Sequence, residues 1–519
     1  MLLIRTFSAA AFTLFITALG LKAAEVRWAA RPIIHKFTGD LTLDEAVKIA
    51  LRQNPDVLKQ LQEIERTRGQ YIEVRAEALP HLTLSAVYDQ RAKELFDAGS
   101  RSGGIQFRTT DPTLGEVLGE VGGGDSSNFI QNKSWQVTLE MRQALYRGGQ
   151  VKAAIKIGEF ARDSAYFQLR DVIDQMVANV RTQFTNVLTN RALINVAEET
   201  VKLQEDQLRD QKNRFEAGTV PRFNVLRAEV ELANVQPDLI RARNRYLLSE
   251  IALAKTLGLD PGPGGKPTFN VVGELTVVGR PLGLQSALDL GRARRPFLKV
   301  QRLAILQRAE EVKVALAGYK PRLDASVGYE YRNSRLSERL DDVIDGWFLG
   351  FTGSWDIFDG FATHGRVTQA RAQLESARIN YDDSVQRVDL EVQTAYANLQ
   401  TARETIRSQQ KNVEQALESL RLANERFGAG AGTQLEVLDA RTALTRARST
   451  ELLARGDYNA ALAEFDRATA TDTLYVEYLR DPLARLERKV LGRTPEVEET
   501  KDAKGKPSPP KKGGSRSQR

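Results

Sequence analysis

The chain contains no cysteine in its 519 residues. This absence excludes disulfide bonds, metal sites built on thiolates and a lipid-modified cysteine at the mature N-terminus. The three histidines, His35, His81 and His364, are scattered along the chain and have no metal-binding spacing. The sequence G-G-K-P at 264–267 lacks the spacing and the Ser or Thr of a phosphate-binding loop. We therefore expect no enzyme, no cofactor and no bound metal.

Long apolar runs are missing from the chain beyond its first residues. No later stretch reaches the roughly 18 apolar residues that a membrane-spanning helix needs. At the N-terminus, Arg5 precedes an apolar run over residues 9–19, and small residues follow. This order is typical of a secretory signal peptide, which we assign to residues 1–23. A membrane anchor is the alternative, but the run is too short for one. The mature chain is therefore expected in the periplasm, or crossing a membrane as strands.

A large excess of one charge is missing from most of the chain. The formal net charge is +7, but the tail from Lys501 to Arg519 holds seven basic side chains against Asp502. The basic balance therefore indicates a disordered Pro/Gly/Ser/Lys tail, assigned to 481–519, rather than a surface for nucleic acid. Docking of this tail on an anionic polymer or lipid is the alternative interpretation. We expect no nucleic-acid partner.

The chain does contain very long helical patterns. Between residues 363 and 427, apolar or small residues recur at alternating steps of three and four. This is the 3.5-residue period of a coiled coil, with one stutter near Val392. A helix of this length spans about 95 Å, and its narrow seam must pack against other long helices. Return helices are predicted over 433–470 here and over 223–257 in the first half.

The sequence contains two copies of one unit. Matching residues fall into two groups, one offset by 241 positions and the other by 212. The matches include Leu82 with Leu323, Tyr88 with Tyr329, Trp135 with Trp347, Phe215 with Phe427, and Gly218 with Gly430. The difference between the offsets places a longer loop, residues 91–133, in the first copy. We divide the mature chain into repeats at 24–281 and 282–480, followed by the tail.

Each repeat predicts a helix, two strands and a long helix hairpin. The first helices are expected over 42–79 and 283–319, where Pro80 and Pro321 end them. Apolar and polar residues then alternate around 82–89, 135–142, 323–332 and 347–357, which is the pattern of strands. A further short strand is expected at 269–272, with an equivalent at 473–479.

The alternation gives each strand one apolar and one polar face. A small soluble sheet has this pattern, but strands joined directly to helices of about 60 residues favour a transmembrane barrel. Trp135, Trp347 and Trp355 lie near strand ends, where aromatic residues form girdles against outer-membrane lipid. Four strands cannot close a barrel, whereas three copies supply twelve. Two or four copies also give even numbers, so the trimer is a hypothesis.

The hairpin tips carry the most specific motifs. They read R-F-E-A-G-T at 214–219 and R-F-G-A-G at 426–430, and L-E-V-L-D-A follows the second at 435–440. Glycines also mark each strand-to-helix joint, in L-Y-R-G-G at 145–149 and I-F-D-G at 357–360. Together with the duplicated plan, these motifs resemble the TolC-type outer-membrane efflux family over residues 41–470.

The resemblance implies a mainly α protein with a transmembrane β part. It implies a homotrimeric, 12-stranded β-barrel continuous with a periplasmic α-helical barrel. Such a channel is the exit duct of a tripartite efflux pump or a type I secretion system in the outer membrane. Its partners are a periplasmic adaptor protein and an inner-membrane transporter. The main rival is a soluble periplasmic coiled-coil adaptor or scaffold, which has no use for four lipid-facing strands.

The resemblance also supplies candidate site residues. Glu436 and Asp439 match carboxylates of the narrow periplasmic aperture, and their spacing places them on one helix face. Glu436 has an alternative role, because T-Q-L-E at 433–436 reads as a capping box. This chain has Asn224 where the family often has an acid and Gly432 where it has a basic residue, so weaker gate contacts are expected. The predicted adaptor contacts at the tips, for which a plain hairpin turn is the alternative, are Arg214, Phe215, Gly218, Thr219, Arg426, Phe427, Gly430 and Thr433.

Overall fold

The computed structural model describes residues 37–90, 107–109, 117–119, 133–260, 263–333 and 342–471. All of these residues belong to one compact unit, Met1–Thr471. The predicted signal peptide, most of the loop 91–133, the strand predicted at 473–479 and the basic tail lie outside the described residues.

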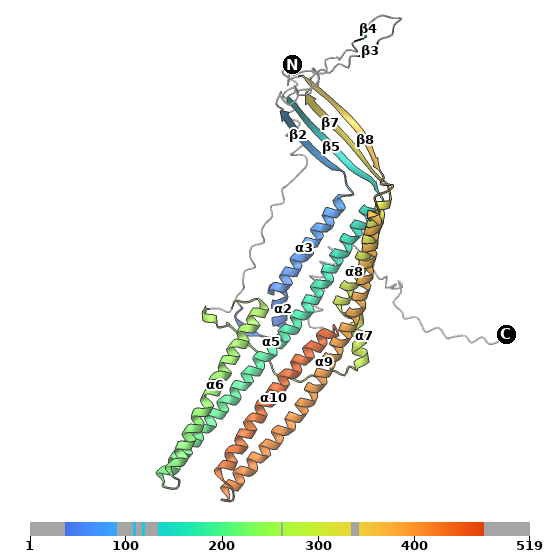
Figure 1. Cartoon of the computed structure of the whole chain (residues 1–519). Helices are drawn as coiled ribbons and strands as arrows, with labels where there is room; N and C mark the ends of the chain where they lie inside the picture. The colour runs from blue at the N-terminus through green and yellow to red at the C-terminus, as the bar shows by residue number, and fades with distance from the viewer. Residues whose placement is uncertain are drawn as a thin grey trace, which may run out of the picture. The chain divides into compact units, whose positions relative to one another are not determined.

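Two series of like elements follow one another along the chain (Figure 1). The first comprises β1 (Gly39–Leu41), α2 (Leu43–Gln53), α3 (Pro55–Ala76), β2 (His81–Gln90), β5 (Lys133–Arg147), α5 (Gln150–Glu216) and α6 (Arg222–Leu257). The second comprises β6 (Phe269–Val271), α7 (Leu284–Arg294), α8 (Pro296–Leu316), β7 (Arg322–Asn333), β8 (Val343–Ser354), α9 (Ala362–Gly428) and α10 (Gln434–Ala468). Within the long loop, β3 (Phe107–Thr109) pairs with β4 (Val117–Gly119). This order matches the predicted plan, while the domain boundaries stay a prediction.

The first helix of each repeat is broken, and the prediction of one continuous helix was wrong in both repeats. A proline lacks the N–H group of a helix interior and forces the residue before it out of the helical region. Asn54, before Pro55, has ψ 126°, and Arg295, before Pro296, has ψ 120°. The Asn54 side chain then caps α3 by accepting a hydrogen bond of 2.9 Å from the amide of Asp56.

The two longest helices confirm the coiled-coil prediction. Both α5 and α9 have 67 residues, and each returns through a short turn into α6 or α10. The predicted seam of α9 is the face that becomes buried. Its buried residues include Val367, Ala370, Val388, Val392, Ala395, Leu399, Ile406, Ala416 and Ala423. None of the helices in the described part of the chain is long and apolar enough to cross a membrane.

The four long strands form one antiparallel sheet in the order β2-β5-β7-β8 (Figure 1). Its register places apolar residues opposite one another across all four strands. One such row runs from Tyr88 to Trp135, and another runs through Leu139, Tyr329 and Trp347. The residues between them, such as Thr138 and Glu330, are polar and share the other face. The predicted two-faced sheet is therefore confirmed.

The end of β8 differs from the prediction. The strand was expected to include residues 347–357, but it ends at Ser354, so Trp355 and Ile357 lie beyond it. On the β7 side, pairing stops where Arg322 meets Ser354. The chain then turns into α9 through Gly360 and Phe361, which have positive φ angles of 65° and 67°.

The apolar core of the second repeat lies where α7, α8, α9 and α10 meet. The rings of Tyr396 and Phe465 are 6.2 Å apart there. The buried Tyr458 hydroxyl donates a hydrogen bond of 2.7 Å to the carbonyl of Val278. At the start of the chain, β1 pairs in parallel with β6, which confirms the short strand predicted at 269–272 to within one residue.

Candidate functional site at the helix tips

The two hairpin tips have the same backbone geometry. Gly218 and Gly430 adopt positive φ angles of 71° and 74°, which glycine reaches without steric cost. The amide of Thr219 donates to the carbonyl of Arg214 at 2.9 Å, and the amide of Ala431 donates to that of Arg426 at 2.9 Å. These bonds satisfy helix carbonyls that otherwise lack a partner, as in other glycine-ended helices. The repeated tip motif therefore has a local structural cause.

A contact between an arginine and an aromatic ring links the two tips. The guanidinium of Arg214, at the end of α5, lies 5.9 Å from the ring centre of Phe427, at the end of α9. A cation at this distance from a ring face is attracted by its electrons. The predicted tip residues Arg214 and Phe427 thus belong to one cluster, although their hairpins are separate in sequence.

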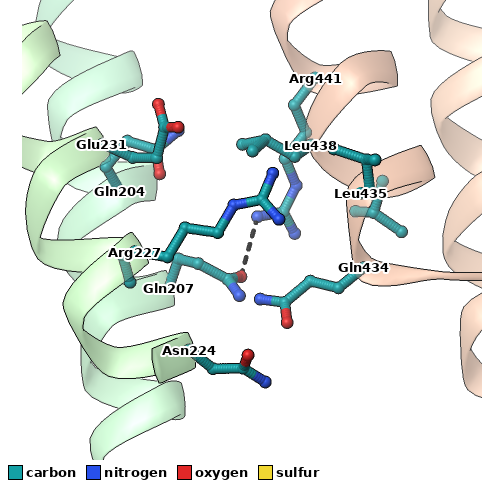
Figure 2. Close-up of a pocket in the computed structure, with 11 residues that line it drawn as sticks. Gln204, Gln207, Asn224, Arg227, Glu231, Gln434, Leu435, Leu438 and Arg441 are labelled. Atoms are coloured by element: carbon teal, nitrogen blue, oxygen red, sulfur yellow. Dashed lines mark hydrogen bonds between the residues drawn. The ribbon is translucent and has the colours of Figure 1, made fainter. Parts of the chain in front are cut away.

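Behind the tips, a small cavity of about 60 Å³ separates the first hairpin from α10 (Figure 2). Arg441 donates a hydrogen bond of 3.2 Å to Gln207 across it. Burial lowers the pKa of Arg441, and no carboxylate in the described residues forms an ion pair with it. The residues that line the cavity are Gln204, Gln207, Asn224, Arg227, Ala228, Glu231, Gln434, Leu435, Val437, Leu438 and Arg441. Figure 2 shows Arg227 and Glu231 on α6 facing Arg441 and Gln434 on α10.

The predicted aperture residues do not form one cluster within a single chain. Asn224 is half-buried and lines the cavity, whereas Glu436 and Asp439 are exposed. The Thr433 hydroxyl accepts a hydrogen bond of 3.3 Å from the amide of Glu436, which caps α10. The Glu436 carboxylate in turn accepts from that hydroxyl at 3.3 Å and lies 3.9 Å from Arg426. Asp439 has no such side-chain partner among the described residues.

Two of the three predicted girdle tryptophans, Trp135 and Trp355, lie near the two ends of the sheet. The ring of Trp135, near the start of β5, is 5.3 Å from that of Tyr331. Trp347 lies farther inside the sheet, between the ends of β8, where it faces Tyr329. Trp355 follows the other end of β8, and its indole Nε1 donates to the carbonyl of Tyr319 at 3.1 Å.

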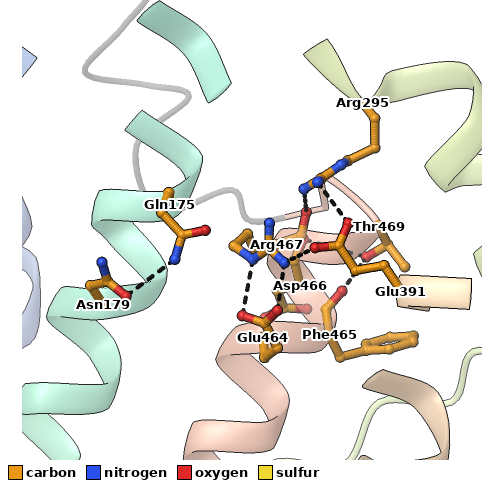
Figure 3. A network of polar contacts seen from close by, with 9 residues as sticks. All are labelled: Gln175, Asn179, Arg295, Glu391, Glu464, Phe465, Asp466, Arg467 and Thr469. Carbon is orange, nitrogen blue, oxygen red and sulfur yellow. Dashed lines mark hydrogen bonds and ion pairs between the residues drawn. The ribbon is translucent and has the colours of Figure 1, made fainter. Parts of the chain in front are cut away.

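A buried polar network joins the two repeats, and sequence reasoning missed it. Figure 3 shows the part of this network around Glu391 and Arg467 in the second repeat. Asp466 on α10 is fully buried, 2.8 Å from Arg181 on α5 and 3.1 Å from Arg280. Beside it, Arg295 lies 2.8 Å from Glu391, a residue of α9 that also pairs with Arg467. The one signal available was that Asp466 follows the apolar residues Leu462 and Ala463 at helical spacing, so an acid lies on an apolar face of α10, which indicates a paired buried charge.

A sequence profile of the outer membrane efflux protein family matches residues 46–259 and 287–471 of the chain. The chain belongs to this family. Protein CyaE of Bordetella pertussis is 26% identical over 441 residues, which cover 84% of this chain and 85% of CyaE. The alkaline protease secretion protein AprF of Pseudomonas aeruginosa is 24% identical over 430 residues, covering 82% and 83%. The solved outer membrane channel CmeC of Campylobacter jejuni has a similar fold, with a TM-score of 0.66 at 15% identity over 84% of this chain and 88% of CmeC.

Membership in the outer membrane efflux protein family confirms the resemblance seen in the tip motifs. This family consists of channel proteins rather than enzymes. The protein is therefore an outer-membrane channel that extends into the periplasm and conducts solutes outward. Its two-faced sheet and its 67-residue helices are the two parts of that channel.

Proposed function

We propose that three copies of this protein form one exit duct, with a 12-stranded barrel in the outer membrane and a helical tube below it. The observation that carries the proposal is the sheet. It has an apolar face across all four strands, and both edge strands, β2 and β8, have a free side. Unpaired strand edges are not tolerated in lipid, so the edges must meet those of other copies. Three copies give twelve strands, an even number that closes with antiparallel pairs throughout.

In this duct the helix tips form the periplasmic entrance. The side chain of Asp439 is exposed, and three copies place three such carboxylates around one axis. Like charges close together repel and attract cations, so this ring favours an open, cation-preferring aperture. Asn224 and the Glu436 carboxylate contribute less, since Asn224 is neutral and Glu436 is engaged at the start of α10.

The duct works with a periplasmic adaptor and an inner-membrane transporter, which supply energy and selectivity. The adaptor docks on the tips, where the backbone turns are exposed at Gly218, Thr219, Gly430 and Thr433, next to the Arg214–Phe427 contact. Relatives support this role, because AprF is named for the secretion of a protease. The tryptophans Trp135, Trp347 and Trp355 contact outer-membrane lipid at the two edges of the barrel.

Extraction and electrophoresis test the proposal. We expect the protein to leave the membrane fraction only with detergent and to migrate as a trimer on a gel when it is not boiled. The purified trimer should form steady cation-preferring channels in a planar bilayer. Release by salt or carbonate without detergent, with a monomer on the gel, would favour the soluble scaffold instead.

A further inference from the structure

The two strand pairs of the chain have the same register. The repeat relates β2 to β7 by 241 positions and β5 to β8 by 212. In the first pair, Leu82 faces Met141, and its counterpart Leu323 faces Gly353, the counterpart of Met141, in the second. The correspondence holds for all ten residue pairs of β2 with β5, from His81 with Arg142 to Gln90 with Lys133. The sheet therefore consists of two copies of one hairpin with the same register.

The two hairpins are joined by the pairing of β5 with β7. In this junction Met141 faces Val327 and Arg142 faces Ser326, and a bulge separates Ala144 from Tyr146. The repeat assigns a counterpart to each side of this junction. The counterpart of β5 is β8 and that of β7 is β2, and these two strands are the free edges of the sheet.

We propose that β8 of one copy pairs with β2 of the next copy in the register of the β5–β7 junction. This proposal rests on the proposed oligomer and adds the residue-by-residue contact between its copies. The same offsets give the pairs Phe351 with Tyr88, Gly353 with Ala86, Ser354 with Ser85, Trp355 with Leu84, and Phe358 with Leu82. Each pair consists of one residue from each copy, so the interface closes head to tail around the ring.

The unequal lengths of the strands support this register. β5 continues for five residues beyond its last partner on β2, because β7 pairs with it there. β8 ends at Ser354, at the last residue that β7 covers. The counterparts of those five residues are 355–359, which pair with no strand among the described residues of a single chain. Pairing with β2 of the next copy extends β8 through this segment.

The exposed apolar side chains where β8 leads into α9 also indicate that this segment lacks a neighbouring strand in the described part of the single chain. Ile357 is 84% exposed, whereas its counterpart Leu145 is 51% exposed. Phe358 is 76% exposed, whereas its counterpart Tyr146 is 46% exposed. Large apolar side chains in this setting indicate an interaction surface. The difference arises because β7 pairs with the first joint and Ala317 lies against it, while no strand among the described residues pairs with the second.

The glycines at the two joints differ in the same way. At Gly148 an added Cβ would lie 2.9 Å from the carbonyl of Ala317, so the backbones approach closely. Its counterpart Gly360 has nothing within 4 Å of that position. The counterpart of Ala317 is Ala76, at the end of α3. The close approach at Gly360 is therefore completed by Ala76 of the next copy.

The side chains of the two edges suit each other in this register. The pairs Phe351 with Tyr88 and Trp355 with Leu84 continue the apolar face of the sheet around the junction. On the polar face, Ser354 meets Ser85. A slip of one residue would exchange the two faces and bury polar groups against lipid.

Disulfide cross-linking tests this register, and the cysteine-free chain needs no prior changes. We would make two double variants, Ser85→Cys with Ser354→Cys and Ala86→Cys with Gly353→Cys, and oxidise them in outer membranes. Directly opposed strand residues have Cα atoms roughly 4.5–5.5 Å apart, which suits a disulfide. A link within one chain is excluded, because β2 and β8 are three strands, or about 14 Å, apart. The matched controls, Ser85→Cys with Thr352→Cys and Thr83→Cys with Ser354→Cys, are slipped by two residues.

We expect the first two variants to give a covalent trimer on a boiled, non-reducing gel, and the controls to give single chains. A covalent trimer from either control, and not from the first two variants, would overturn the register. So would the absence of any cross-link in variants that still run as trimers on an unboiled gel. Neither result would contradict the duct itself. Only monomers on the unboiled gel of the unmodified protein would overturn the proposed oligomer itself.

Discussion

At the scale of single residues, the two carboxylates near the start of α10 differ in their side-chain contacts. Asp439 is exposed and unpaired in the described part of the chain, whereas Glu436 meets the Thr433 hydroxyl at 3.3 Å. The sequence placed both on one helix face, and it also raised the capping role that Glu436 has. It could not place Arg441, because the partner Gln207 is 234 residues away and no local pattern links them.

Asp439→Asn is expected to weaken cation preference and block by multivalent cations. Three charges leave the aperture together, so we expect block to weaken on the order of tenfold or more. Conductance and reversal potential in planar bilayers measure both effects. Glu436→Gln is the matched variant, with a smaller effect expected. Unchanged selectivity in Asp439→Asn would remove this residue from the aperture.

Asp466→Asn is expected to destabilise the protein by about 3 kcal/mol, because it removes the buried carboxylate that contacts both Arg181 and Arg280. Thermal unfolding of the detergent-purified protein measures this loss. The control is Asp206→Asn, which breaks an exposed pair with Arg209 and should change stability by less than about 1 kcal/mol. Equal effects of the two variants would contradict a structural role for the buried network.

Asp171, on α5, makes stability depend on pH. Burial raises the pKa of its carboxyl, against the opposing effect of the nearby Arg295 and Arg467. The folded state then holds a proton that the unfolded state has released, so stability rises as pH falls from the raised pKa towards about 3.9. Asp171→Asn should remove this part of the pH dependence and stabilise the protein at neutral pH. Unfolding temperatures measured across this range test it, and parallel curves for the two proteins would contradict it.

At the scale of elements, periodicity predicted most of the fold. The 3.5-residue seam identified α9 and the alternation identified the strands, since each pattern reports which face is buried. The break at Pro55 was missed although Asn54 and Pro55 form a capping signal for a new helix. The end of β8 was missed because alternation continues to Ile357, while β7 stops pairing at Ser354. Sequence periodicity does not show which hairpins pack together.

Close packing of α10 on α5 depends on Gly456, where an added Cβ would lie 2.6 Å from Thr189 Oγ1. Gly456→Ala should therefore destabilise the protein by about 1–3 kcal/mol, as overpacking does. The control is Gly365→Ala, a helix position with nothing within 4 Å, whose counterpart in the first repeat is Ala153. It should be neutral or stabilising by up to about 1 kcal/mol. Thermal unfolding of both variants measures the difference, and an equal response would contradict the packing argument.

At the scale of the whole molecule, a single chain supplies only part of a closed barrel. Its sheet has two open edges and an apolar face, and its long helices carry narrow seams. Length, duplication and strand pattern were enough to predict this incompleteness. The contacts between copies follow only once the observed junction of β5 with β7 is combined with the repeat.

The most direct test of the account is an image of the detergent-extracted particle by electron cryomicroscopy. We predict three-fold symmetry and a closed wall of twelve strands that continues into a helical tube. A compact single chain, with Trp347 and Trp355 in a dry interior, would contradict the account.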